Sequence, residues 1–320
     1  MKPSVLMTHP RHFAIRGGAN PHTRTKKDEL KEVDPGAALE QWNAYVDALI
    51  QAGLDVYVAD ATPELTGMVF AANAGFLLGR LHERPSPQKT FIPSHFAVEH
   101  RMGESQRYAD FMENFGIKVS DYPEQWSWEG EADAFPVGRG EDVVWIFSHG
   151  FRSDPEVGEW LQSVLETDVV SLKLTTPEYY HGDTALCDLG REALVYLDAF
   201  DAKSQKKLKK ALKDRIVEIE EKDAAKFLGN SFYVESGGER FLFVAKGVRK
   251  KTQAAIGKLG INVVEVDVSE FFGKGGGGPK CLVFNLGICD RAEAGLTEEQ
   301  SAFRHARHIE SVRRRRGPLG

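Results

Sequence analysis

The chain of 320 residues is poor in cysteine, and Cys187, Cys281 and Cys289 are too few and too scattered for a disulfide framework. Long apolar runs that could span a bilayer are also lacking in the sequence. The apolar start of the chain is soon interrupted by His9 and Pro10, which argues against a secretory signal. We therefore expect a cytoplasmic protein in a reducing compartment, with no membrane partner.

Positive charge is in deficit, since 41 Lys and Arg face 47 Asp and Glu, for a formal net charge of −6. A general nucleic-acid binder needs a basic surface, so nucleic acid is excluded as a partner. The basic residues after about 297 predict a solvated helical tail, in which His305 and His308 lack the third ligand of a zinc site. What is present is ordinary globular material, 42% hydrophobic and 28% charged, which can bury a sizeable core.

One pattern occurs five times along the chain. In the first copy the pair Asp34-Pro35 predicts a helix start, and Trp42, Val46 and Leu49 follow at helical spacing. A strand follows each helix, and the five strands begin 45 to 63 residues apart, at Leu54, Ile117, Val169, Ile216 and Ile261. Repetition at this period predicts a modular architecture, for which solenoids and propellers both qualify.

Each copy also has a polar loop and then a second short apolar segment. A polar side chain stands just before or at the start of each such segment; the five are Asn73, Glu129, His181, Asn230 and Cys281. A closed ring of five modules would direct these side chains at one axis. The sequence thus predicts an α/β protein with a central polar site.

The segment "FGKGGGGPKCLVF" at residues 272–284 allows three interpretations: a phosphate cradle, a surface loop or the approach to a nucleophile. A Walker-type phosphate loop needs Ser or Thr after its lysine, and "GKGGGGPKC" has neither. Glycines would let backbone approach a small ligand closely or let the loop move. A surface loop without a role is the alternative.

The interpretation of Cys281 as a nucleophile depends on the side chains at equivalent places in other modules. A thiol with a pKa near ~8.5 is mostly protonated at neutral pH, so it needs a histidine or a cationic substrate nearby. His181 is the candidate histidine, and a carboxylate such as Glu129 would orient it. The alternative for Cys281, as for Cys187 and Cys289, is a small buried hydrophobe.

In order and context these motifs resemble the guanidino-group-modifying enzymes, which include arginine deiminases, dimethylarginine dimethylaminohydrolases and amidinotransferases. The resemblance extends from "VLMTHPRHF" to Cys281 and rests on "GMVFAANAGF", "EHRMGESQRY", "WEGEADAF", "FSHGFRS", "YYHGDTALCDL" and "GGGGPKCLVF". It implies one catalytic domain over residues 1–320, folded as a five-fold pseudo-symmetric α/β propeller of five ββαβ modules around a central cleft. It also implies a hydrolase without cofactor or metal.

The resemblance assigns a role to each candidate. Cys281 would attack the guanidinium carbon to form a covalent thiouronium, and His181 would protonate the leaving amine and then activate water. Glu129 would hold His181; if the family motif aligns two residues later in "EGEAD", Glu131 would take this role instead. Asp183 would bind the guanidinium nitrogens. A cationic substrate favours a thiolate beside it and needs carboxylates to offset its desolvation.

Asn73 stands where deiminases have a second acidic residue that grips the guanidinium. Together with Asn20 in "ANPH", it resembles the arginine dihydrolase branch, which converts arginine to ornithine, ammonia and carbon dioxide. Arg152 and Arg101 are candidates by resemblance for binding the substrate's α-carboxylate, and ordinary surface arginines are the alternative.

Two departures leave the substrate open: Gly182 replaces a common leucine between His and Asp, and His22 replaces an aromatic residue of the dihydrolase branch. Deiminase, dimethylarginine dimethylaminohydrolase and amidinotransferase activities are therefore alternatives within the fold. A silent protein that senses guanidino ligands is the alternative from another class. The expected partner is a small guanidino molecule, and a homo-oligomer is compatible with the sequence.

Overall fold

The computed structural model describes residues 2–79, 89–122 and 124–289, together with positions 298, 302 and 306. Apart from those three positions, the expected basic tail from about residue 297, including His305 and His308, lies outside the described residues. Among the helices of the described ranges, none is long and apolar enough to cross a membrane.

Five three-stranded sheets form the framework of the described chain. The first contains β15 (Phe284–Ile288), β1 (Pro3–Thr8) and β2 (Asp55–Ala59), with α1 (Pro35–Gln51) between β1 and β2. The second contains β3 (Gly75–Leu78), β4 (Thr90–Pro93) and β5 (Lys118–Val119), with α2 (Glu104–Asn114). The third contains β6 (Ala134–Val137), β7 (Val144–His149) and β8 (Val169–Lys173), with α3 (Val157–Leu165).

The remaining two sheets are built in the same way. The fourth contains β9 (Leu186–Asp188), β10 (Ala193–Val195) and β11 (Ile216–Glu218), with α5 (Ala202–Leu212). The fifth contains β12 (Phe232–Ser236), β13 (Glu239–Ala245) and β14 (Asn262–Val266), with α7 (Lys250–Gly257). Three short helices lie outside this scheme: α4 (Gly182–Ala185), α6 (Glu221–Ala224) and α8 (Ser269–Gly275).

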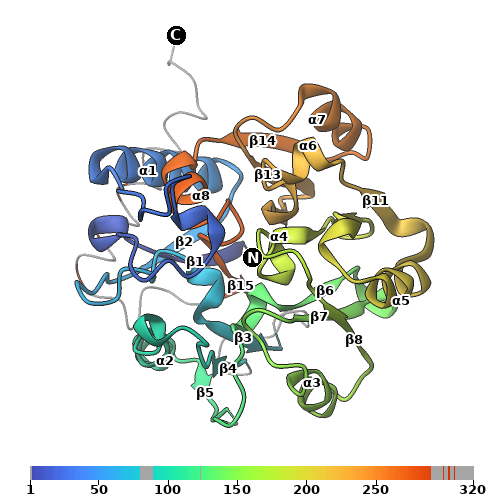
Figure 1. The fold of residues 1–320 in the computed structure, drawn as a ribbon, viewed down its shortest axis with the longest axis horizontal. Helices are drawn as coiled ribbons and strands as arrows, with labels where there is room; N and C mark the ends of the chain where they lie inside the picture. Colours follow the sequence, from blue (N-terminus) through green and yellow to red (C-terminus); the bar gives the residue numbers. More distant parts are fainter. Residues whose placement is uncertain are drawn as a thin grey trace.

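Every sheet has the same connectivity. Its first two strands pair antiparallel, and its third strand, which follows the helix, pairs parallel with the middle strand. In the first sheet the antiparallel partner β15 comes from the other end of the described chain, so β1 and β15 join the two ends. The sheets are arranged about the centre of the molecule, with α1, α2, α3, α5 and α7 on the outside (Figure 1).

The repeated pattern in the sequence is confirmed in its elements. The five expected strands are β2, β5, β8, β11 and β14, each beginning within one residue of its expected position. The five second apolar segments are β3, β6, β9, β12 and β15. None of the described three-stranded sheets closes on itself as a barrel.

Helix α1 shows how local sequence sets an element. The Asp34 side chain accepts hydrogen bonds from the backbone N–H groups of Gly36 and Ala37, at 2.9 and 3.1 Å, and Pro35 occupies the first turn. Trp42 and Leu49 on the same helix are fully buried. They pack in a cluster that includes residues of the first and fifth sheets, so α1 holds two neighbouring modules together.

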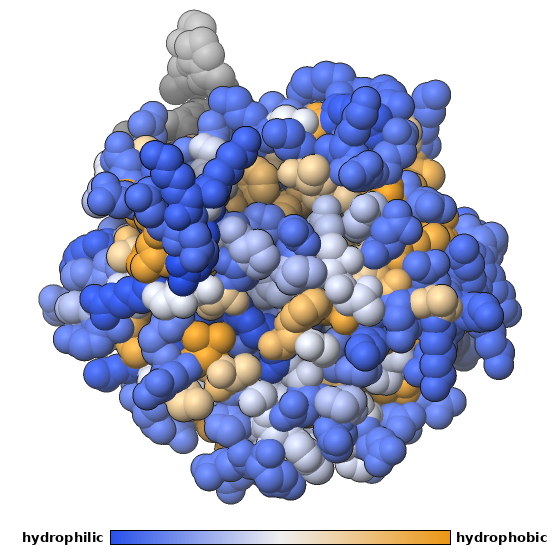
Figure 2. Space-filling view, in the orientation of Figure 1, coloured by the Kyte–Doolittle hydropathy of each residue, from blue (hydrophilic) through white to orange (hydrophobic). Residues whose placement is uncertain are grey.

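The turns before the first strands of the sheets position the polar site. Asn73, Glu129, His181, Asn230 and Cys281 lie in or beside these turns, and none is more than 2% exposed. On the face seen in Figure 2, hydrophilic residues cover most of the periphery, and residues of intermediate hydropathy lie nearer the middle. Five separate loops therefore deliver polar side chains to a buried region.

Replacing the cap tests the account of α1. Asp34→Ala removes the acceptor for two helical N–H groups, so the free energy of unfolding should fall by about 1 kcal/mol. Chemical denaturation of wild type and variant measures this change. Glu40→Ala, at an exposed position of the same helix, is the matched control and should have little effect. Equal stability of Asp34→Ala and wild type would contradict the account.

Candidate functional site

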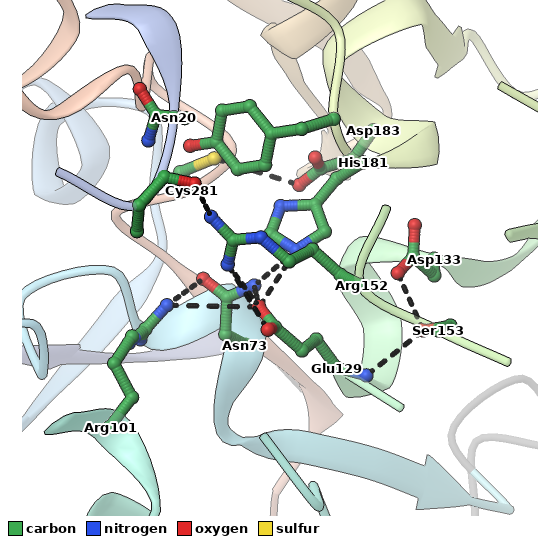
Figure 3. A network of polar contacts seen from close by, with 12 residues as sticks. Asn20, Asn73, Arg101, Glu129, Asp133, Arg152, Ser153, His181, Asp183 and Cys281 are labelled. Atoms are coloured by element: carbon green, nitrogen blue, oxygen red, sulfur yellow. Dashed lines mark hydrogen bonds and ion pairs between the residues drawn. The ribbon is translucent and has the colours of Figure 1, made fainter. Parts of the chain in front are cut away.

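The carboxylate of Glu129 is the centre of the buried polar network in Figure 3. Its Oε2 lies 2.8 Å from Nε2 of His181, and Arg152 Nη1 donates to both of its oxygens at 3.1 and 3.2 Å. Arg101 Nη1 lies 3.9 Å from Oε2. Burial opposes the charge on Glu129, but Arg152, His181 and Arg101 together outweigh it and hold the pKa of this carboxyl well below its usual range. Glu129 is therefore a buried, ionised carboxylate.

Glu131, the alternative partner for His181 by sequence, points elsewhere. Its Oε1 accepts from Lys280 Nζ at 2.7 Å and from the backbone N–H of Asn285 at 3.0 Å. Glu129 precedes the 3-10 turn Gly130–Ala132 and Glu131 lies within it, and Gly130 between them has a φ of 58°. Of the two candidates, Glu129 is the one in contact with the histidine.

Asn73 is hydrogen-bonded on both sides of its amide. Oδ1 accepts from Arg101 Nη1 at 3.2 Å, while Nδ2 lies 3.3 Å from Glu129 Oε2 and 3.3 Å from His181 Nε2. An arginine can only donate and an ionised carboxylate can only accept, so the partners fix which end of the amide is oxygen. The nitrogen of Asn73 therefore faces Glu129 and His181.

The two candidate arginines are both buried and paired within the protein. Arg101 forms a two-point ion pair with Glu104, at 3.0 and 2.7 Å, and Arg152 donates through Nη2 to the Ala19 carbonyl at 2.9 Å in addition to its pair with Glu129. The Arg152 guanidinium also lies 4.7 Å over the ring of Tyr180. Ordinary surface arginines, the alternative from the sequence, do not describe these two residues.

These arginines border a small cavity of about 50 Å³. Asn20 and Asn73 line it as well. Asn20 is held in place because its Nδ2 donates to the Gly275 carbonyl at 3.0 Å and its Oδ1 accepts from the N–H of His22 at 3.0 Å. The four polar side chains thus surround one opening.

The thiol of Cys281 faces the carboxyl of Asp183, with Sγ 3.9 Å from Oδ2. Burial raises the pKa of Cys281 well above its usual range, and the nearby Asp183 raises it further. Burial also raises the pKa of Asp183 to about 7, against the opposing charge of Lys280. At neutral pH the thiol is therefore protonated, and Asp183 is divided between its two forms. A cation bound beside them would lower both pKa values.

Two buried polar atoms of the network have no hydrogen-bond partner within the described part of the chain: Nδ1 of His181 and Oδ1 of Asp183. Buried polar atoms are normally satisfied, and leaving one unpaired is costly. Such atoms are available to a ligand that offers N–H or O–H groups.

The glycine loop packs tightly against an aromatic ring. A Cβ at Gly277 would come within 2.5 Å of the Phe70 ring and 2.9 Å of Cys281 Cβ, and one at Gly275 within 2.4 Å of the same ring. Asn230 Oδ1 accepts from the N–H groups of Gly278 and Cys281, at 2.7 and 3.3 Å. The glycines thus allow the loop to pack against Phe70 and Asn230 just before Cys281.

The sequence did not single out Asp133, which links the backbone of Glu129, through Ser153, to that of Gly182, the residue after His181. Asp133 accepts from Ser153 Oγ at 2.7 Å and from Gly182 N–H at 2.9 Å, and Ser153 Oγ accepts from Glu129 N–H at 3.2 Å. Burial raises the pKa of Asp133 to about 6. Its position in "EGEAD" is the only sequence signal.

Asn230 was expected at the central axis but was given no catalytic or binding role, and Tyr180 was not singled out. The signal for Asn230 was its place in the repeat, equivalent to that of Cys281. Tyr180 stands under Arg152 and donates to the Gly276 carbonyl at 2.9 Å, and nothing in the sequence pattern distinguishes it from its neighbour Tyr179.

The expectation that all candidates line one cleft is met only in part. A larger cavity, of about 260 Å³, borders Asp183, Glu131 and Lys280 but not Asn73 or the two arginines. The binding candidates are therefore divided between these two cavities. Cys281, His181 and Glu129 line neither of the two, although the sulfur of Cys281 lies 3.9 Å from Asp183 at the second.

The arrangement supplies the parts of nucleophilic catalysis: a thiol, a histidine fixed by a carboxylate, and a second carboxyl beside the thiol. Among the described residues there is no group of three His, Cys, Asp or Glu that could hold a metal ion. All three cysteines are free and buried.

Known proteins of similar sequence act on guanidino groups. The bifunctional arginine dihydrolase/ornithine cyclodeaminase ArgZ of Synechocystis sp. is 29% identical over 289 residues, 88% of this chain and 37% of ArgZ. The corresponding enzyme AgrE of Nostoc sp. is 28% identical over 95% of this chain and 41% of its own. The N(G),N(G)-dimethylarginine dimethylaminohydrolase of Mycobacterium tuberculosis is 32% identical over 88% of this chain and 84% of its own. The chain thus spans less than half the length of the two bifunctional relatives.

The fold is likewise shared with a solved structure. The N-terminal domain of ArgZ bound to product superposes with a TM-score of 0.79 and 27% identity, over 90% of this chain and 99% of that domain. The arginine dihydrolases and the dimethylarginine dimethylaminohydrolase that the chain resembles form a class of hydrolases that act on guanidino groups. Within it, the model of the family described as N,N dimethylarginine dimethylhydrolase, eukaryotic, matches residues 9–288, and the chain belongs to this family.

The raised pKa of Asp183 predicts how stability depends on pH. Because its pKa in the folded protein, about 7, lies above the ordinary 3.8, the folded protein binds the proton more tightly than the unfolded chain. This carboxyl therefore lowers stability as pH rises from about 4 to about 7. Asp183→Asn mimics the protonated form, so relative to wild type it should gain on the order of 2 kcal/mol between pH 5 and pH 8.

Urea unfolding of wild type and Asp183→Asn at both pH values measures this gain. Asp110→Asn, on the accessible face of α2, is the control and should show no such pH-dependent difference. The same stability difference between Asp183→Asn and wild type at pH 5 and pH 8 would contradict the prediction.

Proposed function

We propose that the chain is an arginine dihydrolase, which hydrolyses arginine to ornithine, carbon dioxide and two molecules of ammonia through a covalent intermediate on Cys281. The observation that carries this proposal is the orientation of Asn73, whose amide nitrogen faces Glu129 and His181. Similarity to the arginine dihydrolases ArgZ and AgrE supports it.

The first displacement begins when the cationic guanidinium enters beside Cys281 and Asp183. Asp183, whose Oδ1 is free to accept, binds the guanidinium nitrogens as a carboxylate, and the positive charge favours the thiolate. The sulfur forms a bond to the guanidinium carbon, and the C–N bond to one amino group breaks with a proton from His181. Water activated by His181 then adds to the thiouronium carbon, and the C–S bond breaks to give a ureido group.

The second displacement repeats these steps on the ureido carbon. Cys281 adds to the carbon, a second ammonia leaves, and water releases a carbamate that breaks down to ornithine and carbon dioxide. Two waters are consumed for two ammonia and one carbon dioxide, which balances the atoms. The step requires that the neutral ureido intermediate stays bound, and the Asn73 amide can donate to its oxygen where a carboxylate could not.

The α-carboxylate of the substrate would bind at the cavity of about 50 Å³, where Arg101 and Arg152 supply positive charge and Asn20 an amide. Both arginines already have acidic partners, so a substrate carboxylate would compete for their remaining N–H groups. Glu131 is the weakest of the candidates for substrate binding, since it is paired with Lys280.

A second candidate activity is dimethylarginine dimethylaminohydrolysis. The family match over residues 9–288 and the identity of 32% to the mycobacterial enzyme favour it. The two candidate activities are distinguished by measuring the release of dimethylamine from dimethylarginine and the release of ammonia from arginine. Activity on neither compound, or transfer of the amidino group to an added amine, would point to sensing or to amidinotransfer instead.

Three further expectations belong to the same proposal. We infer that the five sheets form a five-fold pseudo-symmetric propeller of ββαβ modules, because all have one connectivity and five polar residues occupy equivalent turns. We also infer a cytoplasmic location and a reaction without metal or cofactor. Homo-oligomers are compatible with the proposal, and light scattering of the purified chain tests their presence.

Replacing the nucleophile tests the covalent mechanism. Cys281→Ser should lower kcat to below about one thousandth of the wild-type value, because no other side chain supplies the thiolate. Cys187→Ser, at a buried free cysteine, is the control and should keep turnover. Mass spectrometry of wild type quenched during turnover should show a substrate-derived adduct on Cys281. Turnover by Cys281→Ser at the wild-type rate would exclude the mechanism.

Replacing Asn73 tests the choice of reaction. Wild type should yield ornithine with about two ammonia per arginine. Asn73→Asp restores a carboxylate that favours the cationic substrate over the neutral intermediate, so its product should shift toward citrulline. Chromatography of the products and an ammonia assay measure both, with Asn262→Asp on the exposed edge of β14 as control. Citrulline as the only wild-type product, or unchanged ornithine from Asn73→Asp, would contradict this account.

A further inference from the structure

Arg101, the arginine that contacts Asn73, forms a buried ion pair with Glu104. Glu104, the first residue of α2, is fully buried, and its two oxygens accept from Arg101 Nε at 3.0 Å and Nη2 at 2.7 Å. Burial raises the pKa of Glu104, while the facing Arg101 lowers it. A two-point contact of this kind fixes the plane of the guanidinium as well as its position.

The other contacts of Arg101 leave its Nη1 group directed at the site. Nη2 donates to the Gly67 carbonyl at 3.2 Å, and the guanidinium lies 4.5 Å from the centre of the Phe96 ring. Nη1 then donates to Asn73 Oδ1 at 3.2 Å. With its plane fixed by Glu104, Arg101 has one orientation in which Nη1 meets the amide oxygen.

We propose that Glu104 is a positioning residue which, through Arg101, fixes the amide of Asn73 with its nitrogen toward the reacting group and so sets the preference for a neutral ureido ligand. The inference rests on the proposed function, in which the ureido intermediate must be retained. It gives Arg101 a second task beside binding the α-carboxylate. Without Glu104 in place, Arg101 Nη1 would move toward Glu129 Oε2, 3.9 Å away, and release the Asn73 oxygen.

A variant that keeps every charge isolates this effect. Glu104→Asp retains the carboxylate but shortens it by one methylene, so it cannot keep both contacts with Arg101. In a Cys281→Ser background, where turnover is absent, the dissociation constants of citrulline and arginine are measured by calorimetry. The two ligands share the same α-carboxylate and α-amino group, so the ratio of their constants reports only on the ureido or guanidino end.

We expect Glu104→Asp to raise the ratio of the citrulline to the arginine dissociation constant about three- to tenfold, the value of one hydrogen bond. Glu113→Asp, at an exposed position near the end of the same helix, should leave the ratio unchanged. An equal weakening of both ligands, or no change in either, would overturn the inference, because a merely structural or carboxylate-binding role predicts a constant ratio.

If Glu104→Asp does not fold, a second variant can displace the same ion pair of Glu104 and Arg101. A methyl group at Gly67 would lie 2.6 Å from Glu104 Oε1 and 2.8 Å from Arg101 Nε, so Gly67→Ala displaces the pair without changing charge. Gly67→Ala should also raise the ratio of the citrulline to the arginine dissociation constant. Gly257→Ala is the control and should leave the ratio unchanged, because its added methyl group would have no atom within 4 Å. A constant ratio in Gly67→Ala would also overturn the inference. Citrulline as the only wild-type product would instead contradict the dihydrolase assignment, and the binding ratio would still decide the role of Glu104.

Discussion

The buried carboxylate of Glu129 must be compensated, because an unpaired charge in a protein interior costs several kcal/mol. Arg152, Arg101 and His181 provide this compensation from three separate segments of the chain. The loops that carry them are thereby held against one point, and Asn73 is bonded into the same cluster. The geometry of the whole site depends on this one charge and its partners (Figure 3).

This constraint also determines which groups remain for a ligand. Because Glu129 is occupied by arginines and histidine, it is not free to bind a guanidinium directly. In the proposed reaction Asp183 and Cys281 receive the guanidinium instead. Burial raises the pKa of both groups, to about 7 for Asp183 and well above the usual range for the thiol. Each is therefore easily neutral in the free protein and becomes charged when a cation arrives. In the proposed reaction, selection for a cation and activation of the nucleophile would then have the same physical cause.

The modular fold explains why a site can be assembled from five distant loops. Each sheet is preceded by a turn at the same place, and each turn presents one polar residue toward the centre of the molecule. One of the five, Asn230, holds the backbone of Gly278 and Cys281 through its amide oxygen. A repeated architecture thus supplies equivalent positions. The chemistry of the side chain at each position determines whether that position is suited to a structural or a catalytic role.

The sequence by itself determined the elements and the candidates. Helical spacing after Asp34, the strands and the polar residues before β3, β6, β9, β12 and β15 depend on local order, so pattern alone located them. Tertiary structure decided which glutamate meets His181, how the Asn73 amide is turned and that Glu104 stands behind Arg101. Each of these depends on where side chains from distant segments, such as Arg152 and Lys280, come to rest. Hydrogen bonds and ion pairs act over a few ångströms in space, and separation along the chain does not encode that distance.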